Sequence, residues 1–417
     1  MKSIYNFSLL TFTALLRLFS GVSPKLKKLV EGRKSVFPSL KNFVENNNKG
    51  IAWFHIASLG EYEQAKPVIR ELKRIYPNCA VVLTFFSPSG YGHVIKKAQP
   101  HIDFITYLPF DTAGNAGKFV DLLNPKMAFF VKYDLWANFI LILKEKNVPL
   151  FLFSASLRRD QIYFKSYGRF FSKVLKSFDH IFTQNQQTLN LLKSIHYNKA
   201  TLTGDTRYDN VKAISQNPKS FPDIKVFIKT KPVIVVGSAW EEDMELIIPF
   251  INAKPSYKFI IAPHDINEKV IADWQTRISL PSIKYSELEA KEVNNEKVIF
   301  IDNIGMLSSL YQYAKIAYVG GAFGKGLHNI LEPLAFGIPV IFGQLKKRGK
   351  FPEAAVSRTY GCGFEVGDAE EFQQVVLSLE KGERHQLACK AADKLVEDNL
   401  GSAGKIMLHV QKIMQAI

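Results

Sequence analysis

Residues 317–343 contain the pattern with the clearest chemical meaning, an apolar run followed by a glycine-rich loop and a helix-like segment. The loop includes Gly320 and Gly321, and the segment 328–336 stops at Gly337, a usual helix-exit residue. A strand, a glycine-rich turn and a helix N-terminus form an anion site, because free N–H groups and the helix dipole point at the ligand. The pattern therefore predicts a phosphate site at this turn.

Asn329 and Glu332 lie three residues apart in the same segment and share one face of the expected helix. A carboxylate at that position accepts hydrogen bonds from a ribose diol. Together with a phosphate at the loop, this arrangement indicates a nucleotide site. A tight βα turn with a surface glutamate explains the same residues equally well.

Polar residues also follow apolar strands in the first half of the chain, where parallel sheets place their ligands. Glu61 comes after the strand expected at 51–58, and Gly60 lets the backbone turn before it. Its carboxylate is either a general base or a helix-capping charge. Asp134 stands at a helix start, where capping is the usual role, and Arg158 faces an anionic acceptor or solvent.

Two residues of the second half occupy comparable positions. Ser238 follows the strand expected at 233–236, and it either donates to a phosphate or caps the next helix. His264 follows the strand expected at 258–262. It either pairs with an anion or is an ordinary surface or core histidine, which is the usual case for a lone histidine.

The sequence patterns of several classes of functional site are absent from the chain. The chain has no HxE zinc pattern, no DxD pair at a strand end and no GxxxxGK[ST] loop, so nothing predicts a bound metal. It has no GxGxxG at the first βα turn, which argues against a nicotinamide dehydrogenase. Cys79, Cys362 and Cys389 are far apart, which indicates a reducing compartment without disulfides.

Length and charge set further bounds. A chain of 417 residues is long enough for two domains, and its 47% apolar and 22% charged residues are ordinary for a globular protein. Its 54 Lys and Arg against 38 Asp and Glu give a net charge of +16. That excess favours an anionic partner: nucleic acid, a lipid surface or a phosphorylated substrate.

The segment 4–22 is apolar and aromatic, with Arg17 inside it. A signal peptide, a membrane span and a helix lying in the membrane surface all compete, as does a buried helix of the first domain. Residues 1–50 hold nine Lys and Arg against two Glu, a net charge of +7, and positive flanks stay cytoplasmic. We expect an N-terminal anchor or surface helix, 1–35, with the remaining chain on the cytoplasmic side.

Short apolar runs alternate with helical periods from residue 51 onward, and a Pro-containing polar stretch interrupts them around 204–227. Repeated βα units predict parallel, doubly wound sheets. We therefore expect two α/β domains, at 36–215 and 216–417, with ligands at the carboxyl ends of the strands.

An ordered set of motifs gives these pieces a family resemblance. The motifs are EGRK at 31–34, SLGE at 58–61, TFFSPSG at 84–90, YLPFD at 107–111, DLWAN at 134–138, SASLR at 154–158, GDTRYD at 204–209 and GG…HNILEP at 320–333. Over nearly its whole length the chain resembles the 3-deoxy-D-manno-octulosonic acid (Kdo) transferases of lipopolysaccharide synthesis. The resemblance implies a GT-B fold, two Rossmann-like domains with a cleft between them.

The resemblance also implies roles for individual residues. Glu61 is the catalytic base of an inverting transfer from CMP-Kdo to a lipid A precursor, without metal or cofactor. The implied CMP-binding residues are Ser238, His264, Gly320, Gly321, His328, Asn329 and Glu332. The implied acceptor-side residues are Ser58, Gly60, Ser89, Asp134 and Arg158. The helix after Gly321 would stabilise the departing phosphate.

The chain departs from the family pattern in two places. Lys132, Asp134 and Ala137 replace residues of an ExELWPN motif, and the sequence Ala262-Pro263-His264 stands where the family has PRH, so the arginine is missing. A membrane-associated GT-B enzyme that uses a UDP-sugar, as a transferase or an epimerase, is the alternative function. A basic nucleic-acid binder is a further alternative, but no aromatic and basic RNA-binding segment supports it, and we expect no nucleic-acid partner.

Overall fold

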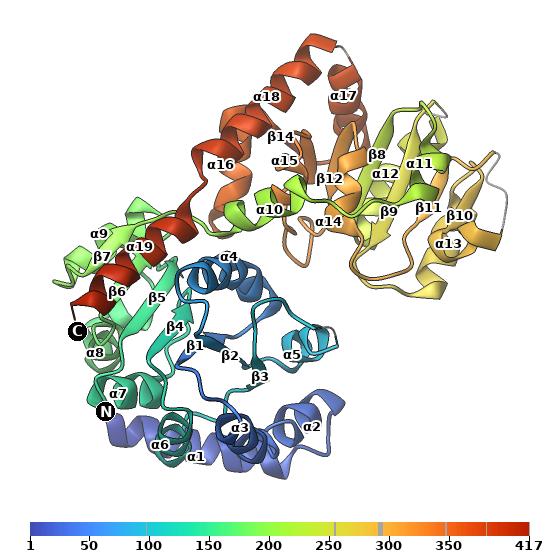
Figure 1. The fold of residues 1–417 in the computed structure, drawn as a ribbon. Helices are drawn as coiled ribbons and strands as arrows, with labels where there is room; N and C mark the ends of the chain where they lie inside the picture. The colour runs from blue at the N-terminus through green and yellow to red at the C-terminus, as the bar shows by residue number, and fades with distance from the viewer. Residues whose placement is uncertain (97, 254–255, 291–294, 347, 381, 417) are drawn as a thin grey trace. The chain divides into compact units, whose positions relative to one another are not determined.

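A computed structural model describes the chain from residue 1 to 416 except for residues 97, 254–255, 291–294, 347 and 381 (Figure 1). The chain divides into two compact units. The first contains Met1–Asn210 together with Gly401–Ile417, and the second contains Val211–Leu400. Each unit is built on a parallel sheet, as the alternation of strands and helices predicts.

In the described residues of the first unit, seven strands form a sheet in the order β3-β2-β1-β4-β5-β6-β7. The strands are β1 (Ile51–Ile56), β2 (Ala80–Phe85), β3 (Phe104–Tyr107), β4 (Met127–Val131), β5 (Leu150–Ala155), β6 (His180–Thr183) and β7 (Ala200–Leu202). The order reverses between β1 and β4, and the carboxyl ends of strands at such a reversal are where open α/β sheets bind ligands.

Helices cover both faces of this sheet (Figure 1). They are α1 (Lys2–Leu18), α2 (Pro24–Glu31), α3 (Val36–Glu45), α4 (Leu59–Ile75), α5 (Pro88–Val94), α6 (Ala113–Leu123), α7 (Ala137–Glu145), α8 (Arg169–Leu175), α9 (Gln186–Ser194) and α19 (Ser402–Gln415). Alternate residues of β1 point to opposite faces: Trp53 packs on Phe119 of α6 and Phe139 of α7, whereas Phe54 belongs to the core beneath α4 and α19.

The second unit has a sheet of seven described strands in the order β10-β11-β9-β8-β12-β13-β14. The strands are β8 (Val233–Ala239), β9 (Lys258–Pro263), β10 (Ser282–Lys284), β11 (Val298–Phe300), β12 (Ile316–Val319), β13 (Val340–Gly343) and β14 (Gly363–Val366). β8 lies between β9 and β12, so the loops after these three strands meet at one edge.

The helices of the second unit follow the same βα alternation. They are α11 (Pro222–Ile228), α12 (Glu241–Ala253), α13 (Glu268–Arg277), α14 (Leu307–Leu310), α15 (Leu331–Leu334), α16 (Pro352–Tyr360), α17 (Ala369–Glu380) and α18 (Gly382–Asp398). Helix α10 (Arg207–Gln216) spans the boundary between the units. Short 3-10 helices lie at Ile162–Phe164, Ser166–Gly168, Tyr285–Ala290, Tyr311–Tyr313 and Arg348–Lys350.

The C-terminal segment of the chain belongs to a different unit from the one predicted. We expected 216–417 to form the second domain, but residues from Gly401 onward belong to the first unit. Gly401 adopts φ +87°, and Asp209 then caps α19 by accepting from the N–H groups of Gly401 (2.6 Å) and Ala403 (2.7 Å). The apolar face of α19, which includes Ile406, is buried in the core of the first sheet.

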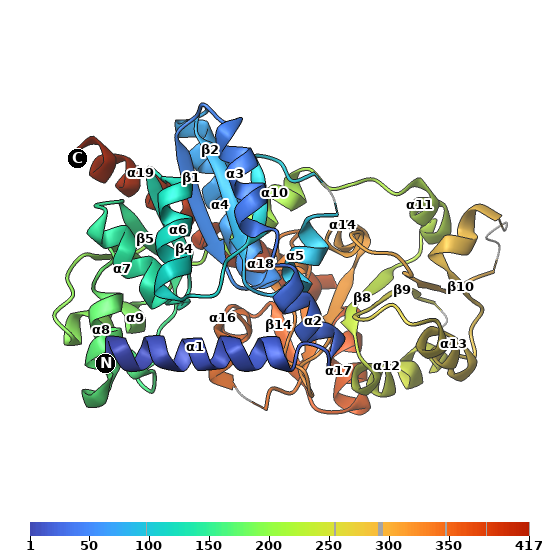
Figure 2. The ribbon, with the colours of Figure 1, turned by 90° about the horizontal axis from the view of Figure 1, so that it is seen from below.

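We also expected residues 1–35 to form a separate N-terminal segment, but in the structure they pack on the first unit. Helix α1 lies flat along this unit (Figure 2). Tyr5 Oη donates to Asp111 Oδ2 (2.5 Å), and Asn138 Nδ2 donates to Asn6 Oδ1 (2.9 Å). In the part of the chain that the structure describes, no helix is long and apolar enough to cross a membrane.

Candidate active site

Glu61 lies in the first turn of α4, directly after the carboxyl end of β1. Its Oε2 accepts a hydrogen bond from the N–H of Ala57 at 2.6 Å, and only 5% of the residue is exposed. Burial, with the nearby carboxylate of Asp134, raises the pKa of Glu61 to about 7. Both roles considered from the sequence are therefore present, since the carboxylate caps the entry to the helix and also has the proton affinity of a general base.

Asp134 does not cap a helix, contrary to one sequence interpretation. Helix α7 begins three residues later, at Ala137. Instead Asp134 Oδ2 lies 3.6 Å from Nε2 of the fully buried His55, and neither atom has a hydrogen-bond partner in the described chain. Thr84 Oγ1 lies 2.9 Å from the other ring nitrogen of His55. This contact orients the imidazole toward Asp134, the carboxylate that helps to raise the pKa of Glu61.

Arg33, from the EGRK motif, is a buried cation close to the same strand ends. Its guanidinium donates to three backbone carbonyls, those of Leu29 (2.7 Å), Phe86 (2.8 Å) and Leu108 (2.8 Å). The guanidinium also lies over the aromatic rings of Phe86, Tyr107 and Phe110. Burial lowers the pKa of Arg33 to about 10. The residue joins α2 to the loops after β2 and β3, and so fixes the N-terminal helices to the edge that carries Glu61.

Asp111, from the YLPFD motif, caps α7. Its carboxylate accepts from the N–H groups of Asn138 (3.2 Å) and Phe139 (3.1 Å), as well as from Tyr5. Burial raises the pKa of Asp111 to about 6. The YLPFD and DLWAN motifs therefore serve one structural purpose, which is to hold α7 and α1 together.

The remaining acceptor-side predictions have mixed outcomes. Ser58 is the N-cap residue of α4 but makes no side-chain cap. Gly60 lies inside α4 in open surroundings, so the expected backbone turn at this glycine is wrong. Ser89 is exposed and bonds Ser87 (2.8 Å). Arg158 is exposed, with its guanidinium 6.0 Å from the ring of Tyr133.

In the second unit, Asp243 holds the glycine-rich loop to the end of β8. Its buried carboxylate accepts from Gly321 N (2.9 Å), Trp240 N (3.0 Å) and Tyr318 Oη (2.8 Å). A Cβ at Gly320 would come within 2.4 Å of Asp243 Oδ2, which explains that glycine. Gly321 adopts φ +93°, a conformation that side chains disfavour. The glycine-rich loop at Gly320 and Gly321, held by Asp243, is therefore preformed, and it is called the cradle below.

Three rings form a stack at the mouth of this cradle. His264 lies between Trp240 (4.5 Å) and His328 (4.3 Å) by ring centroids. Trp240 Nε1 donates to Nε2 of His328 at 3.1 Å. Because an indole N–H can only donate, His328 must be neutral, with its proton on Nδ1. Burial, with His264 nearby, lowers the pKa of His328 to about 4, which agrees with this tautomer.

The helix predicted at 328–336 is shorter in the structure. Only Leu331–Leu334 is helical, as α15, and Asn329 Oδ1 accepts from the N–H of Leu331 (3.3 Å) to begin it. Asn329 Nδ2 also donates to Glu332 Oε1 (3.2 Å), so these two residues do share a face. A single helical turn has almost no macrodipole, and it begins ten residues after Gly321, so the expected helix N-terminus beside Gly321 is wrong.

The remaining donor-side prediction, Ser238, lies at the end of β8 with φ +53°. Its hydroxyl makes no hydrogen bond within the described residues, and α12 begins three residues later. Sequence reasoning missed Trp240, Asp243 and Lys325. Lys325 Nζ lies 5.6 Å from the centre of the Trp240 ring. The only available signals were the place of Trp240 directly after a strand, of Asp243 in the first turn of the next helix, and of Lys325 inside the glycine-rich loop.

Comparison with known proteins places this geometry in a family. The family model for 3-deoxy-D-manno-octulosonic acid transferase (kdotransferase) matches residues 32–210. A 3-deoxy-D-manno-octulosonic acid transferase of Aquifex aeolicus is 32% identical over 349 residues, which cover 81% of this chain and 88% of that protein. The chain belongs to this family. As a Kdo transferase it is a glycosyltransferase, and a relative from Haemophilus influenzae is 28% identical, with 84% and 82% covered.

Solved structures show that the fold of this Kdo transferase is GT-B-like. A UDP-GlcNAc 2-epimerase from Neisseria meningitidis bound to UDP-GlcNAc aligns with a TM-score of 0.62 at 18% identity, covering 87% of this chain and 98% of that one. A 2-epimerase from Listeria monocytogenes aligns with the same TM-score at 13% identity, covering 88% and 98%. No group of three or more metal-ligating side chains occurs among the described residues of the Kdo transferase.

Proposed function

We propose that this enzyme transfers Kdo from CMP-Kdo to a hydroxyl of a tetraacylated lipid A precursor, with inversion at the anomeric carbon. The observation that carries the proposal is the buried Glu61, whose pKa is raised to about 7 at the switch point of a sheet in a Kdo transferase. A base with that pKa is half ionised near neutral pH and can accept the proton of an attacking hydroxyl.

In the proposed reaction Glu61 removes the proton of the acceptor hydroxyl as the oxygen attacks the anomeric carbon. The bond from that carbon to the phosphate oxygen breaks, and CMP leaves with the electron pair. The hydrogen bond from Ala57 keeps one carboxylate oxygen of Glu61 in place, which leaves the other oxygen for the substrate. Asp134 raises the basicity of Glu61 through its charge.

We assign the leaving CMP to the cradle of the second unit. His328 has its Nδ1–H free to donate, because Trp240 occupies Nε2. Lys325 has no carboxylate partner in the described chain, and Ser238 has an unused hydroxyl. These three donors stabilise the negative charge on the phosphate of the leaving CMP, in place of the predicted helix N-terminus. Glu332, with Asn329, remains the proposed contact to the ribose.

A transfer assay in detergent tests the function. The purified enzyme is given the tetraacylated lipid A precursor with either CMP-Kdo or UDP-GlcNAc, and lipid products are identified by mass. We expect a Kdo-bearing lipid with CMP-Kdo only, and thermal stabilisation by CMP rather than UDP. Product or stabilisation with the UDP compounds alone would favour the UDP-sugar alternative, to which the solved structures are similar in fold.

We further propose that α1 lies in the surface of the inner membrane, with the catalytic units on the cytoplasmic side. One face of α1 packs on the protein through Tyr5, Asn6 and Thr13. The opposite face exposes Ile4, Phe7, Leu10, Leu15 and Leu18, and Phe7 and Leu18 are 73% and 75% exposed. An apolar face beside a basic flank supports a helix in the plane of an anionic membrane.

Replacing Ile4, Phe7, Leu15 and Leu18 together by Gln should lower binding to phosphatidylglycerol vesicles by at least about 100-fold, because each buried apolar side chain contributes roughly 1.5–3 kcal/mol. Flotation of vesicles with full-length protein measures this binding. The matched control replaces Leu387 and Leu408, which are equally exposed elsewhere, by Gln. Equal loss of binding in the control, or retained binding in the α1 variant, would contradict the proposed surface.

A further inference from the structure

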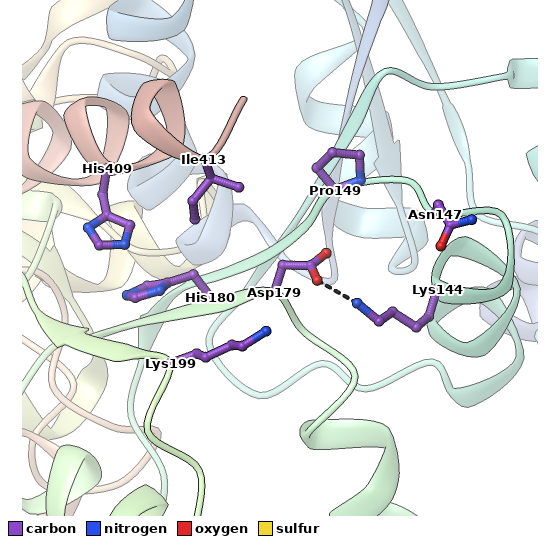
Figure 3. A pocket seen from close by; sticks show the side chains of 8 residues that line it. All are labelled: Lys144, Asn147, Pro149, Asp179, His180, Lys199, His409 and Ile413. Atoms are coloured by element: carbon purple, nitrogen blue, oxygen red, sulfur yellow. Dashed lines mark hydrogen bonds and ion pairs between the residues drawn. The ribbon is translucent and has the colours of Figure 1, made fainter. Parts of the chain in front are cut away.

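A cavity opens in the first unit beside the amino ends of its strands (Figure 3). Glu61, in contrast, follows the carboxyl end of a strand. The cavity has a volume of about 540 Å³. Its lining comes from the residues that precede β5, β6 and β7 and from α7 and α19. The lining residues are Lys144, Asn147, Pro149, Asp179, His180, Lys199, His409 and Ile413. The transfer reaction proposed above uses none of them.

The charges in this cavity are unbalanced. Asp179 is the only carboxylate among the described residues that line the cavity. It is already engaged, since it accepts from Lys144 Nζ (2.5 Å) and from the N–H of Leu150 (3.0 Å). The backbone carbonyl of Lys199 accepts from the N–H of Ile181 (2.9 Å), but its ammonium group makes no ion pair or hydrogen bond within the described part of the chain. The side chain extends along the cavity below His180 (Figure 3). One ammonium group therefore faces the cavity without a counter-charge.

Two imidazoles lie next to this ammonium. The rings of His180 and His409 are 3.9 Å apart between centroids, and His180 Nε2 lies 2.9 Å from Thr201 Oγ1. Burial, with His409 and Lys199 nearby, lowers the pKa of His180 to about 4, and burial with Lys412 lowers the pKa of His409. The surroundings thus disfavour positive charge on both rings, as expected where negative charge is missing.

We propose that this cavity binds a small multivalent oxyanion, a phosphate or a polycarboxylate, between Lys199 and the His180–His409 pair. The lining offers one unpaired ammonium and two imidazoles against a carboxylate that is already bonded, which fits an anion and not a metal ion. His180 is the first residue of β6 and Lys199 directly precedes β7, whereas His409 belongs to α19. A bound anion therefore ties the C-terminal helix to the sheet of the first unit.

The test is NMR of the histidine side chains in the full-length protein, with CMP present so that the donor site is filled. Phosphate, pyrophosphate and citrate are titrated separately at constant ionic strength, and His409→Gln assigns the two signals. We expect saturable shifts of His180 and His409 and a higher melting temperature. Saturation by phosphate or pyrophosphate identifies a phosphate site, and saturation by citrate alone identifies a polycarboxylate site.

Lys199→Gln should weaken this binding by about tenfold or more, because a charge-assisted hydrogen bond is lost. Lys193→Gln changes another exposed lysine of the same unit, one that does not line the cavity, so this matched control should bind like wild type. The melting temperature without anion shows whether each variant folds. The proposal is overturned if no anion gives a saturable shift of His180 and His409, or if Lys199→Gln binds as tightly as the control.

Discussion

Glu61→Gln should lower kcat by about 10²–10⁴-fold while the protein remains folded, because the amide keeps the shape of the side chain but cannot accept a proton. In the wild-type enzyme kcat/KM should rise as the pH increases through about 7, since the carboxylate must be ionised to act as base. The measurement is initial rates of Kdo transfer across pH, with wild type and variant compared at saturating donor.

Two further variants make this result specific. Asp134→Asn removes the negative charge that raises the pKa of Glu61, so the rising limb of its pH profile should move to lower pH. Glu71→Gln changes a half-buried carboxylate of the same helix that pairs with Arg74, and it should leave the profile unchanged. Wild-type turnover by Glu61→Gln would show that another group is the base.

Asp243→Asn should destabilise the second unit by about 2 kcal/mol, which corresponds to a melting temperature lower by about 4–8 °C. The carboxylate accepts from Gly321, Trp240 and Tyr318. An amide has one acceptor oxygen instead of two and carries no charge, so these charge-assisted hydrogen bonds become weaker or are lost. We also expect CMP to bind about tenfold more weakly, because the glycine-rich loop and the Trp240 ring lose a common anchor.

Thermal denaturation and calorimetric titration with CMP measure the two effects. The matched control is Glu242→Gln, which changes the neighbouring carboxylate of the same helical turn. Unchanged CMP affinity in a destabilised Asp243→Asn protein would separate the fold of the loop from the donor site. An unchanged melting temperature would show that the three hydrogen bonds contribute little.

Local sequence was enough to predict both sheets and the position of Glu61. A strand and the helix after it are recognised by periods of two and 3.6 residues, which depend only on neighbouring residues. The βα order then implies parallel strands, whose carboxyl ends share one edge. The identity of Glu61 as a strand-end carboxylate followed from this, and so did the glycine-rich cradle at Gly320 and Gly321.

Other features depended on contacts between residues far apart in the chain. The amphipathic pattern of α19 shows that one face is apolar, but not that it covers the first sheet, because either sheet would bury that face equally well. The length of α15 depended on Asn329 ending the loop before it. The raised pKa of Glu61 depends on burial of its side chain and on the charge of Asp134, which lies 73 positions later in the sequence. Burial and pairing of this kind exist only after the chain has folded, which is why the sequence showed where the carboxylate lies and the tertiary structure showed why it is basic.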